Sequence, residues 1–259
     1  AGARLSLSSL RADTITPSML KALRESGLQT VAIAPEAGSE RLRQAINKTL
    51  TEEQILDAVT AIISAGILNL RLYFMVGLPT ETEEDTAAII QLVKRIKHQQ
   101  LAIGRGQKRL GTITLSVNSF VPKPFTPFQW VPFFDLSLLK KRIKQIKRAL
   151  GGLPNVRVHA DVPRWAYIQA LLSRGDRRLA PLIATVSGNG GNWPKAIKMV
   201  NVNPDFYVYR EREQEELFPW DFIDHGVSKD YLWQEYQAAL AEKATDPCDP
   251  TDCKKCGVC

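Results

Sequence analysis

The four cysteines are the residues whose spacing points most directly to chemistry. All of them lie within the last twelve residues of the 259-residue chain, at Cys248, Cys253, Cys256 and Cys259. Two-residue gaps let thiolates converge on one metal, and a C-x2-C-x2-C run favours an iron–sulfur cluster over zinc, whose ligands more often come as separated pairs. Disulfides would join distant segments instead. The tail therefore predicts a metal site in a reduced, intracellular protein; the alternative is a tail that binds nothing.

A second group of candidate residues follows predicted strands. Glu36 comes after an apolar run and just before Ser39. Its carboxylate can accept hydrogen bonds from ribose hydroxyls or from an ammonium group, or it can merely cap the next helix. Gly77-Leu78-Pro79 and the nearby Glu81 form a turn whose backbone groups can contact a flat base or a phosphate. Any strand-to-helix turn can look like this, so the turn alone is a weak signal.

Two arginines are also candidates. Arg11 ends the first predicted strand, a position from which it can hold a carboxylate through two parallel hydrogen bonds. Arg71 interrupts an otherwise apolar strand, so it is either paired inside a barrel or reaches towards the rim of one. Each of them can equally be one partner of a structural ion pair.

The elements that position these residues alternate along the first 160 residues. We expect strands at 4–8, 31–34, 70–76, 112–121 and 156–158, with helices at 17–26, after Ser39, and at 51–66, 82–97 and 137–150. Strands and helices that alternate with short connections form parallel sheets, which bind ligands at the carboxyl ends of their strands. The loops 9–13, 35–39, 77–81 and 120–130 are therefore expected to meet at one edge of the sheet.

Beyond Arg164 the alternation fades. We expect helices at 165–172, 179–185 and 229–240, and a loop at 187–192. The predicted organisation is a strand–helix domain over 1–160, an α-rich extension over 161–245 and a cysteine-rich tail over 246–259.

Composition narrows the class of protein. The net charge of +7 favours an anionic partner only weakly, although Lys140, Lys141 and Lys144 lie on a basic helix that could contact RNA. An apolar stripe makes that helix more typical of the outside of an α/β barrel. No apolar run is long enough to span a bilayer. The chain begins Ala-Gly-Ala rather than with Met, which suggests a fragment.

Several segments together resemble the radical SAM superfamily. They are Ser6-Leu-Ser-Ser-Leu-Arg-Ala-Asp13, Ala34-Pro-Glu-Ala-Gly-Ser-Glu-Arg-Leu-Arg43, Leu72-Tyr-Phe-Met-Val-Gly-Leu-Pro-Thr-Glu81 and the segment 116–130. Within the superfamily they look most like large, poorly characterised proteins that carry a cobalamin-binding-type domain ahead of the radical SAM domain. The resemblance extends over nearly the whole chain.

The resemblance implies a partial (β/α)6 TIM-like barrel with S-adenosylmethionine (SAM) across its strand ends. In the family, the positions of Glu36, Ser8 and Arg11 face the methionine and ribose, and the turn 77–79 runs beside the adenine. Ser39, Arg71 and Glu81 complete the expected cofactor-binding residues. A [4Fe-4S] cluster reduces the sulfonium, and the resulting 5′-deoxyadenosyl radical abstracts a substrate hydrogen.

The chain departs from this family at one point. The family holds its cluster with a C-x3-C-x2-C loop, but no cysteine precedes Cys248 here. The opening strand corresponds best to the third strand of the barrel. We therefore expect the C-terminal part of a cytoplasmic radical SAM enzyme, inactive alone, whose parent could bind cobalamin. The alternatives are a methylthiotransferase-like enzyme acting on tRNA or the ribosome, and a cluster-less scaffold.

Overall fold

The structure is a computed structural model that describes residues 7–107, 110–249, 251, 253 and 255–258. The chain divides into two compact units. The first unit comprises 1–119, 137–161 and 239–244, and the second comprises 120–136, 162–238 and 245–259.

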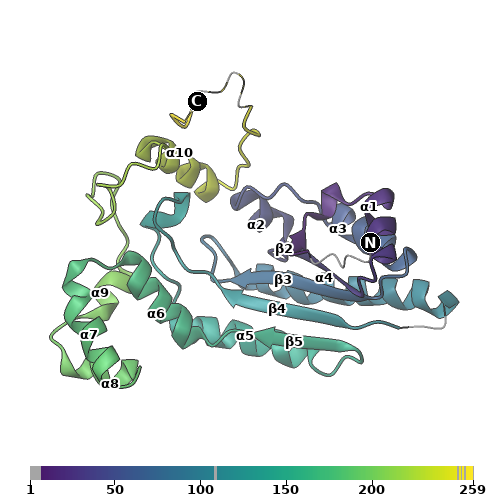
Figure 1. The fold of residues 1–259 in the computed structure, drawn as a ribbon, viewed down its shortest axis with the longest axis horizontal. Coiled ribbons are helices and arrows are strands. Elements are labelled where there is room, and N and C mark those ends of the chain that lie inside the picture. The colour runs from purple at the N-terminus through teal and green to yellow at the C-terminus, as the bar shows by residue number, and fades with distance from the viewer. Residues whose placement is uncertain (1–6, 108–109, 250, 252, 254, 259) are drawn as a thin grey trace. The chain divides into compact units, whose positions relative to one another are not determined.

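A five-stranded parallel sheet forms the centre of the first unit (Figure 1). Its strands are β1 (Ser9–Leu10), β2 (Thr30–Glu36), β3 (Asn69–Val76), β4 (Ile113–Ser119) and β5 (Val156–Ala160). They lie side by side in chain order, and every neighbouring pair is parallel. The predicted α/β class is confirmed. The sheet is open, as expected of part of a TIM-like barrel rather than a closed one.

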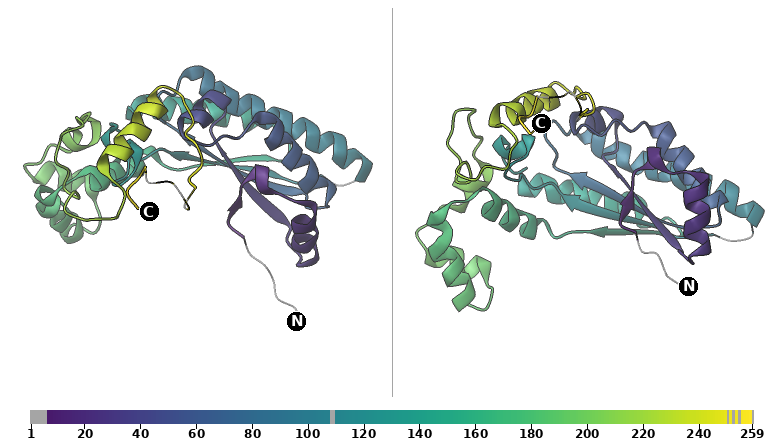
Figure 2. Two further views of the ribbon diagram at one scale, coloured as in Figure 1. Left: turned by 90° about the horizontal axis from the view of Figure 1, so that it is seen from above. Right: turned by 45° about the horizontal axis from the view of Figure 1, so that its top comes forward.

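The connections between these strands are helical. They contain η1 (Ala12–Thr14), α1 (Pro17–Glu25), α2 (Glu40–Ala45), α3 (Glu52–Ser64), α4 (Glu83–Gln107) and α5 (Leu136–Leu150). Local sequence sets their starts: Thr16 accepts a hydrogen bond from the Met19 N–H, and Thr51 forms a capping box with Gln54. Figure 2 shows the helices between β2 and β4, in dark blue, along one face of the sheet.

The strands bury one face and leave the other accessible. In β3, Leu70, Leu72, Phe74 and Val76 are buried, whereas Arg71 between them is exposed. The same alternation continues in β4, since side chains of a strand point alternately to the two faces of its sheet. The apolar face is therefore the one that packs into the core.

The first strand differs from the prediction. Strand β1 contains only Ser9 and Leu10, which pair with Ala32 and Ile33, whereas the sequence predicted a strand at 4–8. Residues 4–6 lie outside the described residues, and Leu7 and Ser8 precede the strand. Helix α4 also continues ten residues beyond its predicted end at Lys97, because no proline or capping glycine follows there.

The second unit is helical. It contains η2 (Pro127–Trp130), α6 (Pro163–Arg174), η3 (Arg177–Leu179), α7 (Ala180–Gly188), α8 (Trp193–Met199), α9 (Pro204–Tyr209) and most of α10 (Lys229–Leu240). Trp130 is fully buried at its centre, with its ring stacked on Tyr236 and edge-on to Phe218 and Trp233. The predicted loop at 187–192 is wrong at its start, because α7 continues through Gly188.

Among the described residues, no helix combines the length and apolar character required to cross a bilayer.

Candidate functional site

Glu36 ends strand β2 in an unusual backbone conformation. Its φ is 68°, in the left-handed region that non-glycine residues rarely occupy, and the register of β2 against β3 shifts between Ile33 and Glu36. The Lys48 ammonium lies 3.2 Å from the Glu36 carboxylate. About a quarter of the Glu36 side chain remains exposed. Glu36 is thus held at the carboxyl end of the sheet with acceptor capacity to spare.

The turn after β3 is shaped by Glu81. One carboxylate oxygen accepts hydrogen bonds from the backbone N–H groups of Gly77 at 2.7 Å and Leu78 at 3.1 Å. These N–H groups, expected from the sequence to be available to a ligand, are both engaged within the protein. Pro79 and Thr80 stay partly exposed, whereas Gly77, Leu78 and Glu81 are buried. Glu81 therefore fixes the shape of the turn.

The second carboxylate oxygen of Glu81 ties the turn to helix α5. It accepts a hydrogen bond from Arg142 at 2.5 Å and one from Thr86 at 3.3 Å. Burial raises the pKa of Glu81 above its ordinary value, while Arg142 and the two backbone N–H groups act in the opposite direction. Arg142 is thus part of the core and does not belong to the exposed basic face of α5.

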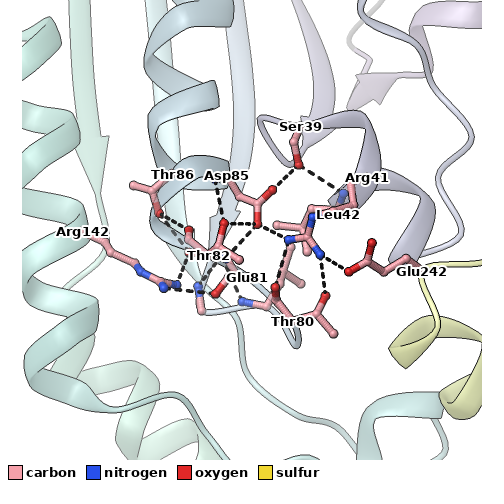
Figure 3. Close-up of polar contacts among 12 residues, drawn as sticks. Ser39, Arg41, Leu42, Thr80, Glu81, Thr82, Asp85, Thr86, Arg142 and Glu242 are labelled. Atoms are coloured by element: carbon pink, nitrogen blue, oxygen red, sulfur yellow. Dashed lines mark hydrogen bonds and ion pairs between the residues drawn. The ribbon is translucent and has the colours of Figure 1, made fainter.

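A second network joins the loop after β2 to the loop after β3 (Figure 3). The Ser39 hydroxyl caps α2 by accepting from the Leu42 N–H and donates to Asp85 at the start of α4. Arg41 forms ion pairs with Asp85 and Glu242 and donates to the Thr80 carbonyl at 2.9 Å. Ser39 is therefore engaged in joining the two loops.

Asp85 is the centre of this network. It accepts from the backbone N–H and the hydroxyl of Thr82, at 2.8 and 3.1 Å, which caps the start of α4. Burial raises the pKa of Asp85, but hydrogen bonds from Ser39, Thr82 and Arg41 outweigh it and hold the pKa below the usual value. Asp85 is consequently ionised near neutral pH.

At the end of β1, Arg11 is paired with its own neighbour. Its guanidinium donates to both carboxylate oxygens of Asp13, at 3.0 and 2.7 Å, and this hydrogen bonding lowers the pKa of Asp13. The predicted bidentate geometry exists, but its partner is a side chain of the same loop. Arg11 remains about half exposed, and Ser8 is exposed beside the strand.

The carboxyl end of β4 is closed by hydrogen bonds to the residue after β5. Ser119 donates through its N–H and its hydroxyl to the two carboxylate oxygens of Asp161, at 2.9 and 3.0 Å. Arg71 lies elsewhere: it is the third residue of β3, five residues before the end of that strand. The structure therefore gathers Glu36, Ser39 and the turn 77–81 at one edge and leaves Arg71 away from it.

The cysteine tail belongs to the second unit. Cys253 and Cys256 are half-buried, and the Cys256 carbonyl accepts a hydrogen bond from the Ser228 N–H at 2.8 Å. Cys248 is exposed, and Cys259 lies outside the described residues. Within the described part of the chain, no three acidic, histidine or cysteine side chains gather as a metal site would require. The predicted metal site remains a prediction.

Comparison with known proteins shows the family of one segment of the first unit. Residues 4–93 match the model of the radical SAM superfamily. This segment belongs to the radical SAM superfamily. The matched residues include β1, β2, β3 and their connections, so the radical SAM segment contains Glu36, Ser39 and the turn 77–81.

Three curated proteins are similar to the chain. An uncharacterized protein of Methanocaldococcus jannaschii is 41% identical over 179 residues, which are 69% of this chain and 37% of that protein. An uncharacterized methyltransferase of Pyrococcus horikoshii is 34% identical over 88 residues, 34% of this chain and 19% of that protein. The tRNA-2-methylthio-N(6)-dimethylallyladenosine synthase of Petrotoga mobilis is 27% identical over 114 residues, 42% of this chain and 26% of that protein. The chain thus spans less than two fifths of each of these relatives.

Sequence reasoning missed the residues that fix the strand-end loops. Arg41 and Arg142 read as parts of a charged helix face, yet they bond to Asp85 and Glu81, 44 and 61 residues away. The Thr82–Asp85 cap was recognisable because its two partners are three residues apart. No local signal reports a contact between distant helices.

Proposed function

We propose that this chain is the later part of a radical SAM domain and that SAM lies across the carboxyl ends of its strands. The observation that carries the proposal is the position of Glu36, whose backbone is left-handed at the end of a strand. Its carboxylate pairs with Lys48 and still has lone pairs that can accept hydrogen bonds from a ligand. Its oxygens are suited to the ribose hydroxyls or the amino group of SAM. The turn 77–81, held by Glu81, supplies a fixed surface beside it.

The chain's residues fit SAM but not the [4Fe-4S] cluster. Exposed polar groups at the strand ends can hold a nucleoside and an amino acid, whereas the cluster needs thiolate ligands, and the chain has no cysteine ahead of Cys248. SAM, when reduced, supplies radical chemistry; the residues described here bind and orient it. Any catalytic activity then belongs to a parent protein that supplies such ligands. Cobalamin and a cytoplasmic location also stay predictions.

Titration calorimetry with SAM tests this proposal. We expect one-to-one binding to the chain and about tenfold weaker binding by Glu36→Gln, because losing one charge-assisted hydrogen bond costs about 1.4 kcal/mol. Glu53→Gln is the matched control, since Glu53 is an exposed helix residue outside the strand-end loops and the substitution is the same. Equal affinities of the two variants, or no binding to the folded wild-type chain, would overturn the proposal.

RNA modification is the second candidate function. The relative from Petrotoga mobilis is named as a synthase acting on tRNA, and 42% of this chain aligns with it. Lys140 and Lys144 are exposed on α5, as RNA contact would require, whereas Lys141 is paired with Glu83 at 2.9 Å. Independently of RNA, the proposal includes an iron–sulfur or zinc site at the four cysteines of the tail.

A further inference from the structure

The accessible face of the sheet carries an aligned row of basic and hydroxyl side chains. The strand register places Arg71 of β3 opposite Thr114 of β4, and Thr114 opposite Arg157 of β5. Residues opposite each other in a sheet point to the same face. Neighbouring strands are about 4.8 Å apart, so the two arginines flank Thr114 with their Cα atoms about 10 Å from each other. Both arginines are exposed.

The positive charge of this row is not balanced by the acidic groups at the sheet edge. Among the described residues, neither Arg71 nor Arg157 has a hydrogen bond or an ion pair. The two acidic groups at the ends of the neighbouring strands are already engaged: Glu36 pairs with Lys48, and Asp161 accepts from Ser119. Both guanidinium groups therefore keep their donors available to an anion.

A second row of donors lies two residues closer to the carboxyl ends of the strands. The register aligns Tyr73, Ser116 and His159 on the same face as the arginines. Each of these side chains can donate a hydrogen bond, and none of them is a carboxylate. Tyr73 and Ser116 are half-buried and His159 is exposed. The face therefore offers donors in two consecutive rows.

We propose that Arg71, Thr114 and Arg157 bind a phosphate group of the substrate. A carboxylate is satisfied by the fork of one arginine, whereas a phosphate presents three or more acceptor oxygens and suits two arginines on either side of a hydroxyl. This inference rests on the proposed function, because it names the substrate class of the same radical SAM segment. It also gives Arg71 a role different from the predicted cofactor contact.

The position of the row sets the shape of the substrate. Arg71 lies five residues before Val76, and a strand rises about 3.3 Å per residue, so the phosphate would be held about 16 Å from the strand ends. A substrate whose reactive atom meets SAM at those ends must be elongated, with the row of Tyr73, Ser116 and His159 along its middle. Its phosphate can come from a small phosphomonoester or from the RNA backbone.

Calorimetric titrations of the whole chain with inorganic phosphate, with glycerol 3-phosphate and with a short single-stranded RNA lacking a terminal phosphate test this inference. Inorganic phosphate and glycerol 3-phosphate contain no base, so neither can occupy the position of the SAM adenine. We expect the double variant Arg71→Gln/Arg157→Gln to bind at least tenfold more weakly, because it removes two charged hydrogen-bond donors from the phosphate. Lys195→Gln/Lys198→Gln removes the same charge from exposed positions of α8 and should change the affinity less than twofold.

The outcomes separate this inference from the proposed function. Stronger binding of glycerol 3-phosphate, or of the RNA, that depends on the two arginines supports the phosphate site and identifies its source. Equal weakening by both double variants, equal competition by acetate, or binding of no probe would overturn it. SAM affinity is measured on the same variants, with circular dichroism as a check of folding. If Glu36→Gln loses SAM binding but still binds phosphate, the phosphate site is unaffected. If the double arginine variant loses phosphate binding but still binds SAM, the proposed function is unaffected.

Discussion

At the scale of single residues, two residues at or just after the ends of neighbouring strands have unfavourable backbone conformations. Glu36 has a φ of 68° and Thr80 has a φ of 61°. Such conformations cost about 1–3 kcal/mol each and persist only where surrounding contacts impose them. Lys48 holds Glu36, and Arg41 holds Thr80 through its carbonyl. Strain that is maintained at two adjacent strand ends is typical of a functional site.

Asp85 gives a pH-dependent prediction at this scale. Its folded-state pKa is lowered, so its stabilising contribution is present above its unfolded pKa of about 3.9 and is lost as the pH falls through the folded value. We expect Asp85→Asn to cost about 2 kcal/mol at pH 7, since it weakens hydrogen bonds to a charged group. The cost should shrink below about pH 4.

Urea unfolding followed by circular dichroism at pH 7 and at pH 3 measures both values. Glu53→Gln, which removes an exposed carboxylate, serves as the control and should cost little at either pH. A cost of Asp85→Asn that is the same at both pH values would contradict the assignment of an ionised, hydrogen-bonded Asp85.

At the scale of elements, the loop after β2 lies directly against helix α4. A Cβ atom added to Gly38 would lie 2.2 Å from the Ile89 backbone nitrogen and 2.7 Å from the Asp85 carbonyl oxygen. These are backbone atoms of a helix, which cannot move aside as a flexible side chain can. Glycine is therefore required where the loop carrying Glu36 and Ser39 meets α4.

Gly38→Ala should consequently separate the loop from α4. We expect a loss of about 1–3 kcal/mol in the free energy of unfolding, as for other overpacked sites, together with weaker SAM binding. Gly152→Ala is the control, because a Cβ at Gly152 meets nothing within 4 Å. Thermal unfolding and calorimetric titration of both variants provide the measurements. Unchanged stability of Gly38→Ala would show that the loop and α4 are less tightly packed than described.

The elements also show what the sequence can and cannot predict. Periodicity predicted β3, α3 and α5 almost to the residue, because burial of one face imposes that pattern. The register shift before Glu36 was not predictable, since it depends on how β2 meets β3. The row of Arg71, Thr114 and Arg157 was not predictable either. Each of these residues is 43 positions after the one before it, and only the strand register brings the three side by side.

At the scale of the whole molecule, the two units divide the predicted chemistry between them. The first unit holds the radical SAM segment and the strand-end residues, and the second holds all four cysteines. A thiolate-bound cluster therefore has no ligand within the first unit. The proposed roles follow from this division: the first unit binds and orients SAM and the substrate, and the cysteine tail is a separate metal site.

Amide hydrogen exchange with and without saturating SAM tests the central claim most directly. Exchange should slow in peptides covering 34–40 and 77–82, because a ligand across the strand ends reduces the local opening of both loops. Peptides from α6 and α7 in the second unit should not change. Protection confined to the second unit, or absent although calorimetry shows binding, would contradict the placement of SAM at the carboxyl ends of the strands.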